Sequence, residues 1–283
     1  MKKIKQTLRN LLPERLFLKL IFKKYMGYYP NLKNPQTLSE KTQWLKLNDR
    51  SELQTICADK FLVRDFISET IGDDYLVPLY FQSYNIDDLT KEKIPNVPCV
   101  LKTNHDNGGV FFIYDKNDIE WDDIVNHLKG RLKKNYYYTL REWQYKNIKP
   151  CIIVEKLLQD EFGNVPNDLK AYCFNGKVEF IQVDKDRGKS NQTRDYYTKE
   201  WNRVEFEWGT VKKPDYIISR PQKLDDLITL SEIIAKNFKY VRVDWYEVKN
   251  KLYFGEITFH PGGGFEDMTP KEYDQYYANM IDT

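Results

Sequence analysis

Two acidic residues, Asp244 and Glu256, lie in strand-like segments where apolar residues would pack better. The alternation in VRVDWYEVKNKLYFGEITFHPGGG predicts two strands joined by a turn near Asn250. Pairing across that turn places Asp244 opposite Glu256, and Arg242 opposite Thr258, on one side of the ribbon. Facing carboxylates destabilise a sheet unless a cation lies between them, and Mg²⁺ is typically bound by one or two carboxylates. The pattern indicates either a metal site or a register shifted by one residue, which would turn Glu256 to the opposite face.

Lys102 stands at the end of a predicted strand, within LKTNHDNGG, and Gly108 and Gly109 lie in the polar turn that follows it. An ammonium group beside exposed backbone N–H groups suits the binding of a polyphosphate. The chain contains neither GxxxxGK[ST] nor GxGxxG, which excludes a P-loop and a dinucleotide-binding turn. Taken alone, this segment is also consistent with a solvated lysine at the end of a strand.

The segment PCIIVEKLL predicts a strand that is buried on both faces, because it is almost continuously apolar. It ends at Glu155, and Leu157 follows, so its end can offer backbone hydrogen bonds and an apolar wall to a purine ring. Asp168, a little further along the chain, can accept hydrogen bonds from ribose hydroxyls. Each of these residues is also ordinary at a strand end.

The elements that carry these residues alternate between helical and strand periods, without internal repeats. This pattern predicts an α+β fold with mainly antiparallel sheets, and it differs from a Rossmann alternation. The strongest hairpin signal is Asn175-Gly176. The predicted helices span 37–49, 51–72, 86–94, 118–135, 223–238 and 269–281, and the predicted strands lie in 75–81, 97–115, 150–158, 169–184 and 241–258.

Composition restricts the class of protein. The 44 basic and 42 acidic residues leave a formal charge of +2, so no overall field favours nucleic acid, and we expect no nucleic-acid partner. The four cysteines are isolated within apolar runs, which is typical of buried, reduced thiols in a cytoplasmic protein. Only three histidines are present, which leaves few ligands for zinc.

Residues 1–30 predict a basic amphipathic helix, whose second half begins at Pro13. Lys19 interrupts its apolar run, so we expect neither a secretory signal nor a membrane span. Two interpretations remain. The helix packs on the body of the protein, or it makes peripheral contact with an anionic surface such as the inner face of the cytoplasmic membrane.

Several segments, taken in order, resemble one known family. NPQTLSEKTQWLKLNDR, ADKFLVRDFI, LKTNHDNGG, REWQYKNIKP, CFNGKVEFIQVDKDR and GEITFHPGGGF are similar to the TupA-like ATP-grasp family of bacterial cell-surface polysaccharide loci, from about Leu32 onward. The resemblance implies an ATP-grasp fold in which three subdomains with mainly antiparallel sheets grip ATP between two lobes. It divides the chain into the N-terminal helix (1–30), an N-terminal subdomain (31–95), a central lid subdomain (96–156) and a C-terminal subdomain with the metal site (157–283).

The resemblance also implies roles for the nucleotide-binding residues. Lys60 and Lys102 match the lysines that contact the ATP phosphates, and Gly108 and Gly109 lie in the loop that closes over them. At the other end of the nucleotide, Glu155 and Leu157 match the hinge beside the adenine, and Asp168 matches the acid beside the ribose.

At the reacting end, Asp244 and Glu256 match the Mg²⁺ ligands, and Arg242 matches the arginine that stabilises negative charge on the transferred group. Thr258 departs from the pattern, because many ATP-grasp enzymes carry asparagine at this position. A hydroxyl can also bind magnesium, so Thr258 is a further candidate ligand.

Further polar residues are candidates for substrate binding on their chemistry alone. Lys170, Lys185, Arg187 and Arg194 lie in DLKAY and VDKDRGKSNQTRD, and they can hold a carboxylate or an acyl-phosphate. The alternative for the second segment is a solvated loop. His260, close to the predicted metal ligands in sequence, is either a substrate contact or a structural residue.

The predicted activity is that of an ATP-dependent carboxylate–amine ligase that forms an amide through an acyl-phosphate. The family's setting implies a uronic-acid unit of a capsular, O-antigen or teichuronic polysaccharide as the carboxylate, an amino acid as the amine, and ATP with Mg²⁺. Two alternatives remain, a glycosyltransferase of a polysaccharide locus and a non-catalytic ATP-grasp scaffold. The chain has no D-x-D motif for the former, and Asp184-Lys185-Asp186 does not replace one.

Overall fold

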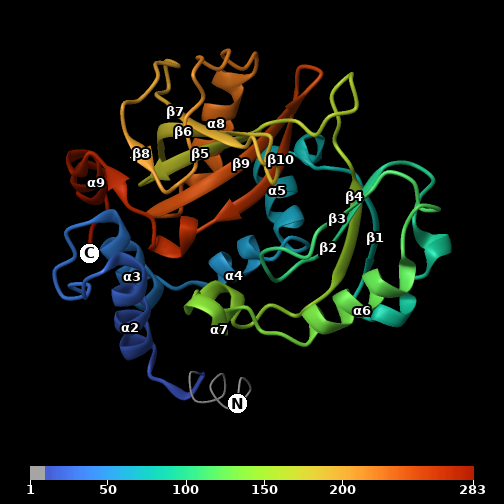
Figure 1. Ribbon diagram of the computed structural model, residues 1–283, viewed down its shortest axis with the longest axis horizontal. Helices are drawn as coiled ribbons and strands as arrows, with labels where there is room; N and C mark the ends of the chain where they lie inside the picture. Colours follow the sequence, from blue (N-terminus) through green and yellow to red (C-terminus); the bar gives the residue numbers. More distant parts are fainter. Residues whose placement is uncertain (1–9) are drawn as a thin grey trace.

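The computed structural model describes residues 10–283 and has the predicted α+β organisation. Two sheets dominate it, one of four strands and one of five, and a third sheet has two short strands. All strand pairs within the described residues are antiparallel. Figure 1 shows the two large sheets on opposite sides of the protein, with α4 and α5 between them. This arrangement lets residues from both sheets face a common region.

The smaller of these sheets has the strand order β1-β4-β2-β3. Its strands are β1 (Leu79–Ser83), β2 (Cys99–Thr103), β3 (Phe111–Ile113) and β4 (Ile152–Lys156). The four residues 152–155 of β4 are all buried, which confirms the prediction of a strand covered on both faces. Helix α6 (Trp121–Leu132) packs Ile124 and Leu128 into the core of this sheet.

The larger sheet has the strand order β10-β9-β5-β6-β7. Its strands are β5 (Asp168–Phe174), β6 (Lys177–Lys185), β7 (Thr193–Tyr197), β9 (Tyr240–Val248) and β10 (Lys251–Thr258). The predicted hairpin turn joins β5 to β6, and Asn175 and Gly176 both have positive φ (49° and 77°). The turn between β9 and β10 is formed by Lys249 and Asn250, with φ of 51° and 60°. Positive φ at both central positions is the conformation of a tight hairpin turn, and asparagine tolerates it well.

The two faces of the five-stranded sheet differ because successive side chains of a strand point to opposite sides. One face carries apolar residues such as Ala171, Val243 and Ile257, which belong to the same core as α5 (Val63–Ile71) and α8 (Leu224–Ala235). The other face carries charged side chains on β5, β6, β7, β9 and β10 toward the end of the sheet that holds Asp168, and aromatic side chains toward the opposite end. Burial of the first face therefore fixes the direction of every side chain on the second.

The predicted helix at 51–72 is wrong as a single element. The structure has two helices, α4 (Glu52–Ala58) and α5, separated by a turn at residues 59–62. The carboxylate of Asp59 causes the break, because its Oδ1 accepts hydrogen bonds from the backbone N–H groups of Phe61 and Leu62. The break points Lys60 toward the loop after β2, where its Nζ lies 2.6 Å from the carbonyl oxygen of Asp106.

The remaining elements pack around both large sheets. Helix α3 (Leu38–Asn48) begins with a capping box, in which Thr37 accepts from the backbone of Glu40. The predicted helix at 86–94 forms only two short 3₁₀ turns. The other elements are α7 (Tyr137–Leu140), β8 (Glu207–Trp208), β11 (Met268–Thr269) and α9 (Lys271–Ala278), and the 3₁₀ turns are η1 (Asp73–Tyr75), η2 (Ile86–Asp88), η3 (Lys91–Lys93), η4 (Trp143–Tyr145) and η5 (Pro261–Gly264).

Helix α2 (Glu14–Met26) follows Pro13, as the sequence predicts, whereas the part of the predicted helix at residues 1–9 lies outside the described residues. Figure 1 shows α2 next to α3. Its Phe17, Leu18 and Phe22 are buried, so this helix packs on the body of the protein. Within residues 10–283, every helix is too short or too polar to cross a bilayer.

Candidate active site

The hairpin of β9 and β10 places Asp244 opposite Glu256 and Arg242 opposite Thr258, as predicted. Near the turn, however, the pairing is displaced by one residue, with Phe254 opposite Trp245. A β-bulge at Gly255 absorbs the difference and turns Glu256 to the face of Asp244. A Cβ atom at Gly255 would lie only 3.0 Å from the backbone oxygen of Asp244, so the close approach favours glycine.

The cation between the two carboxylates is Arg242 itself. Its guanidinium donates to both oxygens of Asp244, at 2.6 and 2.7 Å, and to Glu256 at 3.2 Å. It also donates to the hydroxyl of Thr258 at 3.1 Å. The four side chains thus form one connected group on the polar face of the sheet, and Arg242 relieves the repulsion that facing carboxylates would otherwise create.

The two carboxyl groups differ in acidity. Burial raises the pKa of Asp244 to about 6, although Arg242 and Lys170 act in the opposite direction. Burial would also raise the pKa of Glu256, but Lys60, Arg242 and Arg187 outweigh it and lower the pKa to about 2. Glu256 is therefore fully ionised at neutral pH, and its side chain remains 36% exposed.

Asp244, Glu256 and Thr258 offer oxygen donors that fit Mg²⁺. This metal commonly takes only one or two carboxylates and completes its coordination with substrate phosphates and water. No group of three His, Cys, Asp or Glu side chains that could hold a metal occurs in the described part of the chain. Glu256 is the more accessible donor, since both oxygens of Asp244 already accept from Arg242. The role of these residues as metal ligands stays a prediction.

The two lysines predicted to contact phosphates come from different elements. Lys60 follows α4, and Lys102 belongs to β2. Burial lowers the pKa of Lys60. Among the neighbouring charges, Glu256 has the largest effect and raises this pKa, and Lys102 has the next largest and lowers it. The charges of Lys102 and Glu256 thus both act on Lys60, although Glu256 belongs to the five-stranded sheet.

The residues predicted to contact the nucleoside have protein partners in this structure. Glu155 forms ion pairs with Lys102 at 2.6 Å and with Arg64 at 3.2 Å. The N–H of Leu157 donates to the carbonyl oxygen of Pro98. Asp168 accepts from Arg187 at 3.0 Å and from Tyr246 at 3.4 Å. Arg64 and Tyr246 are thus partners that the sequence did not indicate.

Only some of the candidate substrate residues lie together. Lys170 and Arg194 both bind Asp184 on the polar face of the large sheet, and Arg194 donates to it at 2.7 Å. Lys185 follows Asp184 on β6 and therefore points to the other side, where it binds the hydroxyl of Tyr216. Arg187 remains 52% exposed beside Asp168.

The structure places His260 in a buried network behind the turn at residues 261–264. Its Nδ1 lies 3.2 Å from the side-chain nitrogen of Gln144 and 3.7 Å from Glu142. Burial, and then the charge of Lys46, lowers its pKa well below the usual value, so the imidazole is neutral. Lys46 donates to the carbonyl oxygen of Gly263 at 2.7 Å. These contacts support a structural role, and a substrate contact by His260 stays a prediction.

The glycine-bearing loop after β2 has a partner that the sequence did not indicate. Gly108 and Gly109 have φ of 90° and 66°, a region that favours glycine. Arg131 at the end of α6 binds the carboxylate of Asp106 at 2.6 Å and the carbonyl oxygen of Asn107 at 2.7 Å. A Cβ at Gly109 would lie 2.3 Å from the Cδ of Arg131. Arg131 therefore holds the loop against α6.

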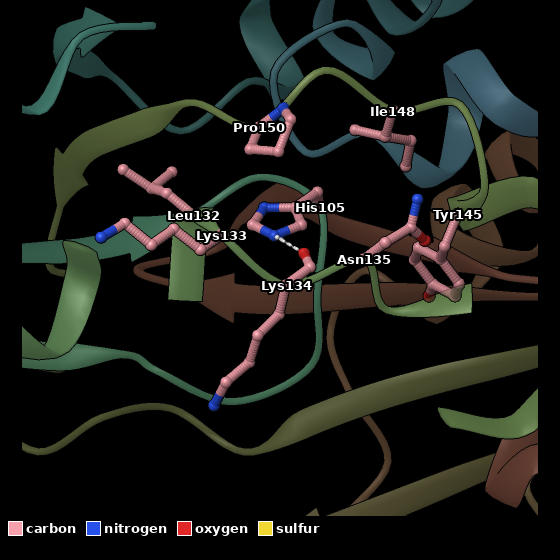
Figure 2. A pocket seen from close by; sticks show the side chains of 8 residues that line it. All are labelled: His105, Leu132, Lys133, Lys134, Asn135, Tyr145, Ile148 and Pro150. Carbon is pink, nitrogen blue, oxygen red and sulfur yellow. Dashed lines mark hydrogen bonds between the residues drawn. The ribbon is translucent and has the colours of Figure 1, made fainter. Parts of the chain in front are cut away.

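A small pocket of about 140 Å³ is lined by His105 and by the segment that follows α6. Figure 2 shows His105 in this pocket, where its Nε2 donates to the carbonyl oxygen of Lys134 at 3.1 Å. The side chain of Lys134 extends away from His105 (Figure 2). This contact anchors the backbone of residues 133–135 to the glycine-bearing loop.

Solved structures provide the first comparison. The chain matches a D-alanine–D-alanine ligase from Bacillus anthracis in complex with ATP at 20% identity, covering 72% of this chain and 55% of that one, with a TM-score of 0.43. It matches the ADP complex of purK, an N5-carboxyaminoimidazole ribonucleotide synthetase, at 14% identity, covering 77% and 49%, with a TM-score of 0.44. The ATP-grasp ligase PsnB, with a phosphomimetic precursor variant, Mg and ADP, matches at 10% identity, covering 78% and 57%, with a TM-score of 0.43.

The chain spans about half the length of these solved structures. No curated protein matches it. The family comparison is decisive instead, because the model described as TupA-like ATPgrasp matches residues 40–282, which is most of the chain. The fold is therefore the ATP-grasp fold, and the chain belongs to the TupA-like ATP-grasp family.

Proposed function

We propose that this protein is an ATP-dependent carboxylate–amine ligase that forms an amide through an acyl-phosphate. The ionised carboxylate of Glu256 carries the proposal, because the charges of Lys60, Arg242 and Arg187 all act on it and Arg242 donates to it at 3.2 Å. A site that mixes oxygen donors with fixed cations suits a triphosphate and its metal. It also needs no nucleophilic side chain, since both reacting groups belong to substrates.

The reaction has two steps. A carboxylate oxygen of the first substrate attacks the γ-phosphorus of ATP, the bond to the β–γ bridging oxygen breaks, and ADP leaves. The amine then attacks the carbonyl carbon of the acyl-phosphate, phosphate leaves, and the nitrogen loses a proton. Lys60 and Lys102 would neutralise the phosphate oxygens, and Arg242 would stabilise the negative charge that develops on the transferred group. Bound Mg²⁺, held by Glu256 and Asp244, would supply further charge neutralisation.

The proposed substrates are a uronic-acid-containing saccharide of a capsular, O-antigen or teichuronic polysaccharide and an amino acid. The resemblance described above supports this choice, because it implies a setting in bacterial cell-surface polysaccharide loci. The cation-rich polar face, with Arg187 exposed beside Asp168, is compatible with an anionic substrate. All four cysteines are free and buried, which together with the need for ATP supports a cytoplasmic setting.

The test is phosphate release from ATP and Mg²⁺ across a panel of amino acids, with galacturonate or glucuronate as acceptor. Release that requires both the amine and the uronate, with an amide in the product, supports the ligase. Release of a nucleoside diphosphate from a sugar nucleotide would identify a glycosyltransferase instead. A scaffold would show no Mg²⁺-dependent binding of ATP in calorimetry.

We also propose peripheral contact of α2 with an anionic membrane surface. The side of α2 that faces away from the protein exposes Leu16 and Leu20, each 45% accessible, beside exposed Lys19 and Lys23. Apolar side chains flanked by lysines are typical of helices that lie in a membrane interface.

Co-sedimentation with vesicles that contain phosphatidylglycerol tests this contact, with phosphatidylcholine vesicles as the control. The charge reversals Lys19→Glu and Lys23→Glu should abolish it. These point changes are preferable to deletion of α2, which would also remove the buried Phe17 and Phe22. Failure of the intact protein to bind the anionic vesicles would refute the proposal.

A further inference from the structure

A second pocket, of about 510 Å³, lies beside the glycine-bearing loop. Pockets that bind small molecules commonly measure about 300–1,000 Å³, so its size suits one or two sugar rings. Asp106 from the loop and Arg131 from the end of α6 form one part of its lining. Lys133, Lys134 and Tyr138, from the segment that follows α6, form another part. None of these residues was a candidate in the sequence.

The charge of this lining selects for anions. Arg131, Lys133 and Lys134 are cationic, whereas Asp106 is the one acidic residue among the lining residues. Asp106 is already neutralised by Arg131 at 2.6 Å. Within residues 10–283, neither Lys133 nor Lys134 forms an ion pair, and both side chains are exposed. Two ammonium groups therefore remain available to a ligand, and a carboxylate is a natural partner for each of them.

Tyrosine rings supply the apolar part of the lining. Tyr138 is 38% exposed, and Tyr136 also lines the pocket. A tyrosine offers an apolar ring face together with a polar hydroxyl, so it suits a sugar ring, which has C–H groups on its faces and hydroxyls on its edge. The combination of ammonium groups and tyrosine rings favours an anionic saccharide over a simple inorganic anion.

The pocket is connected to the proposed reaction centre by two short paths. Tyr136 packs edge-to-face on Tyr145, with ring centroids 5.0 Å apart, and the charges of Glu256 and Arg242 both act on the pKa of the half-buried Tyr145 phenol. On the other path, the backbone of Asp106, whose side chain lines the pocket, accepts a hydrogen bond from Lys60. A saccharide that occupies the pocket would thus lie next to the phosphate-contacting loop.

We propose that this pocket binds the saccharide substrate through a uronate unit adjacent to the one that reacts. The inference rests on the proposed ligase function and deepens it, because it assigns an oligomeric, carboxylate-bearing saccharide to named residues. One uronate lies at the reaction centre, and the next places its carboxylate beside Lys133 and Lys134 and its ring against Tyr138.

Binding of trigalacturonate without nucleotide tests the pocket directly, by calorimetry. The uncharged trisaccharide maltotriose is the matched ligand control. The double substitution Lys133→Ala, Lys134→Ala should weaken trigalacturonate binding at least tenfold, and so should Tyr138→Ala. Lys129→Ala is the matched protein control, because Lys129 lies on α6 outside the pocket and only faces exposed Asp87 at 3.7 Å. Unchanged affinity in the double variant, or equal binding of maltotriose, would overturn the proposal.

Steady-state kinetics separates this inference from the proposed function. The double variant should raise KM for trigalacturonate at least tenfold, with kcat unchanged, and should leave KM for monomeric galacturonate unaltered. Uronate-dependent phosphate release with identical KM values in the variant and the wild type would refute the pocket and leave the ligase standing. Loss of trigalacturonate binding in the variant, with no phosphate release in the wild type, would support the pocket and refute the ligase.

Discussion

Arg242 and Asp244 lie two residues apart on β9 and form a bidentate ion pair, with Nε–Oδ1 at 2.6 Å and Nη2–Oδ2 at 2.7 Å. Both side chains point to the polar face of the five-stranded sheet, and Glu256 joins the pair from β10. The pair keeps a buried acid in place next to an ionised and accessible one. Removal of either partner therefore affects both stability and the proposed chemistry.

Arg242→Ala is expected to destabilise the protein by about 3–5 kcal/mol, because it leaves the buried carboxylate of Asp244 without its partner. Urea denaturation followed by tryptophan fluorescence measures this loss. Arg220→Ala is the control, since Arg220 forms an exposed pair with Asp225 and should change stability by less than about 1 kcal/mol. An equal effect of the two substitutions would contradict the importance of the buried pair.

Gly255→Ala should displace the pairing of β9 and β10, because the added Cβ would lie 3.0 Å from the backbone oxygen of Asp244. We expect a loss of about 1–3 kcal/mol of stability from the overpacking, together with a loss of Mg²⁺-dependent ATP binding as Glu256 moves. Calorimetric titration with ATP and Mg²⁺ measures the second effect. Gly130→Ala on α6, where an added Cβ has no neighbour within 4 Å, should be neutral or stabilising. Normal ATP binding in Gly255→Ala would show that the bulge tolerates a side chain.

Glu256→Gln should lower ATP affinity in the presence of Mg²⁺ at least tenfold and have little effect when EDTA is present, because the substitution removes the accessible carboxylate. Isothermal titration under both conditions makes the comparison. Glu247→Gln on the same hairpin provides a matched loss of one charge outside the site, and it should bind ATP as the wild type does. An affinity for ATP that is independent of Mg²⁺ in the wild type would exclude the predicted metal role.

Asp184 should make the free energy of unfolding depend on pH in acidic solution. Burial alone would raise its pKa, but Lys170 and Arg194 lower it from 3.8 to about 2. Because the pKa of Asp184 is lower in the folded protein than in the unfolded chain, its ionised form stabilises the fold. This stabilisation is complete above about pH 4 and is lost as the pH falls through about 2, which changes the free energy of unfolding by about 2 kcal/mol. The difference in unfolding free energy between the wild type and Asp184→Asn should therefore narrow below pH 4. For Asp225→Asn, at an exposed position, the free energy of unfolding should differ from that of the wild type by the same amount at every pH.

Local patterns in the sequence predicted the hairpins and most of the long helices. Asn175-Gly176 forms the expected turn, and the apolar run before Glu155 is a strand covered on both faces. The predicted pairing of Asp244 with Glu256 is also present. These features follow from interactions between residues near in sequence, or from alternation that a buried face imposes.

Several features depend on partners far along the chain, and the sequence did not indicate them. The helix break at Asp59 was missed because that carboxylate also accepts from Asn104, a residue of the loop after β2. Strand β7 was missed because Arg194 lies in a polar segment, and its pairing with the buried Asp184 on β6 is what holds it in the sheet.

The sequence by itself determined the order of the functional segments, the family and the positions of the hairpin turns, because these depend on residue type and short-range periodicity. Only the tertiary structure decided that Arg242 is the cation between the facing carboxylates and that Gly255 sets their register. It also decided that Arg131 from α6 holds the glycine-bearing loop. These contacts depend on how the sheets and helices meet in space, and neither residue type nor spacing along the chain specifies that.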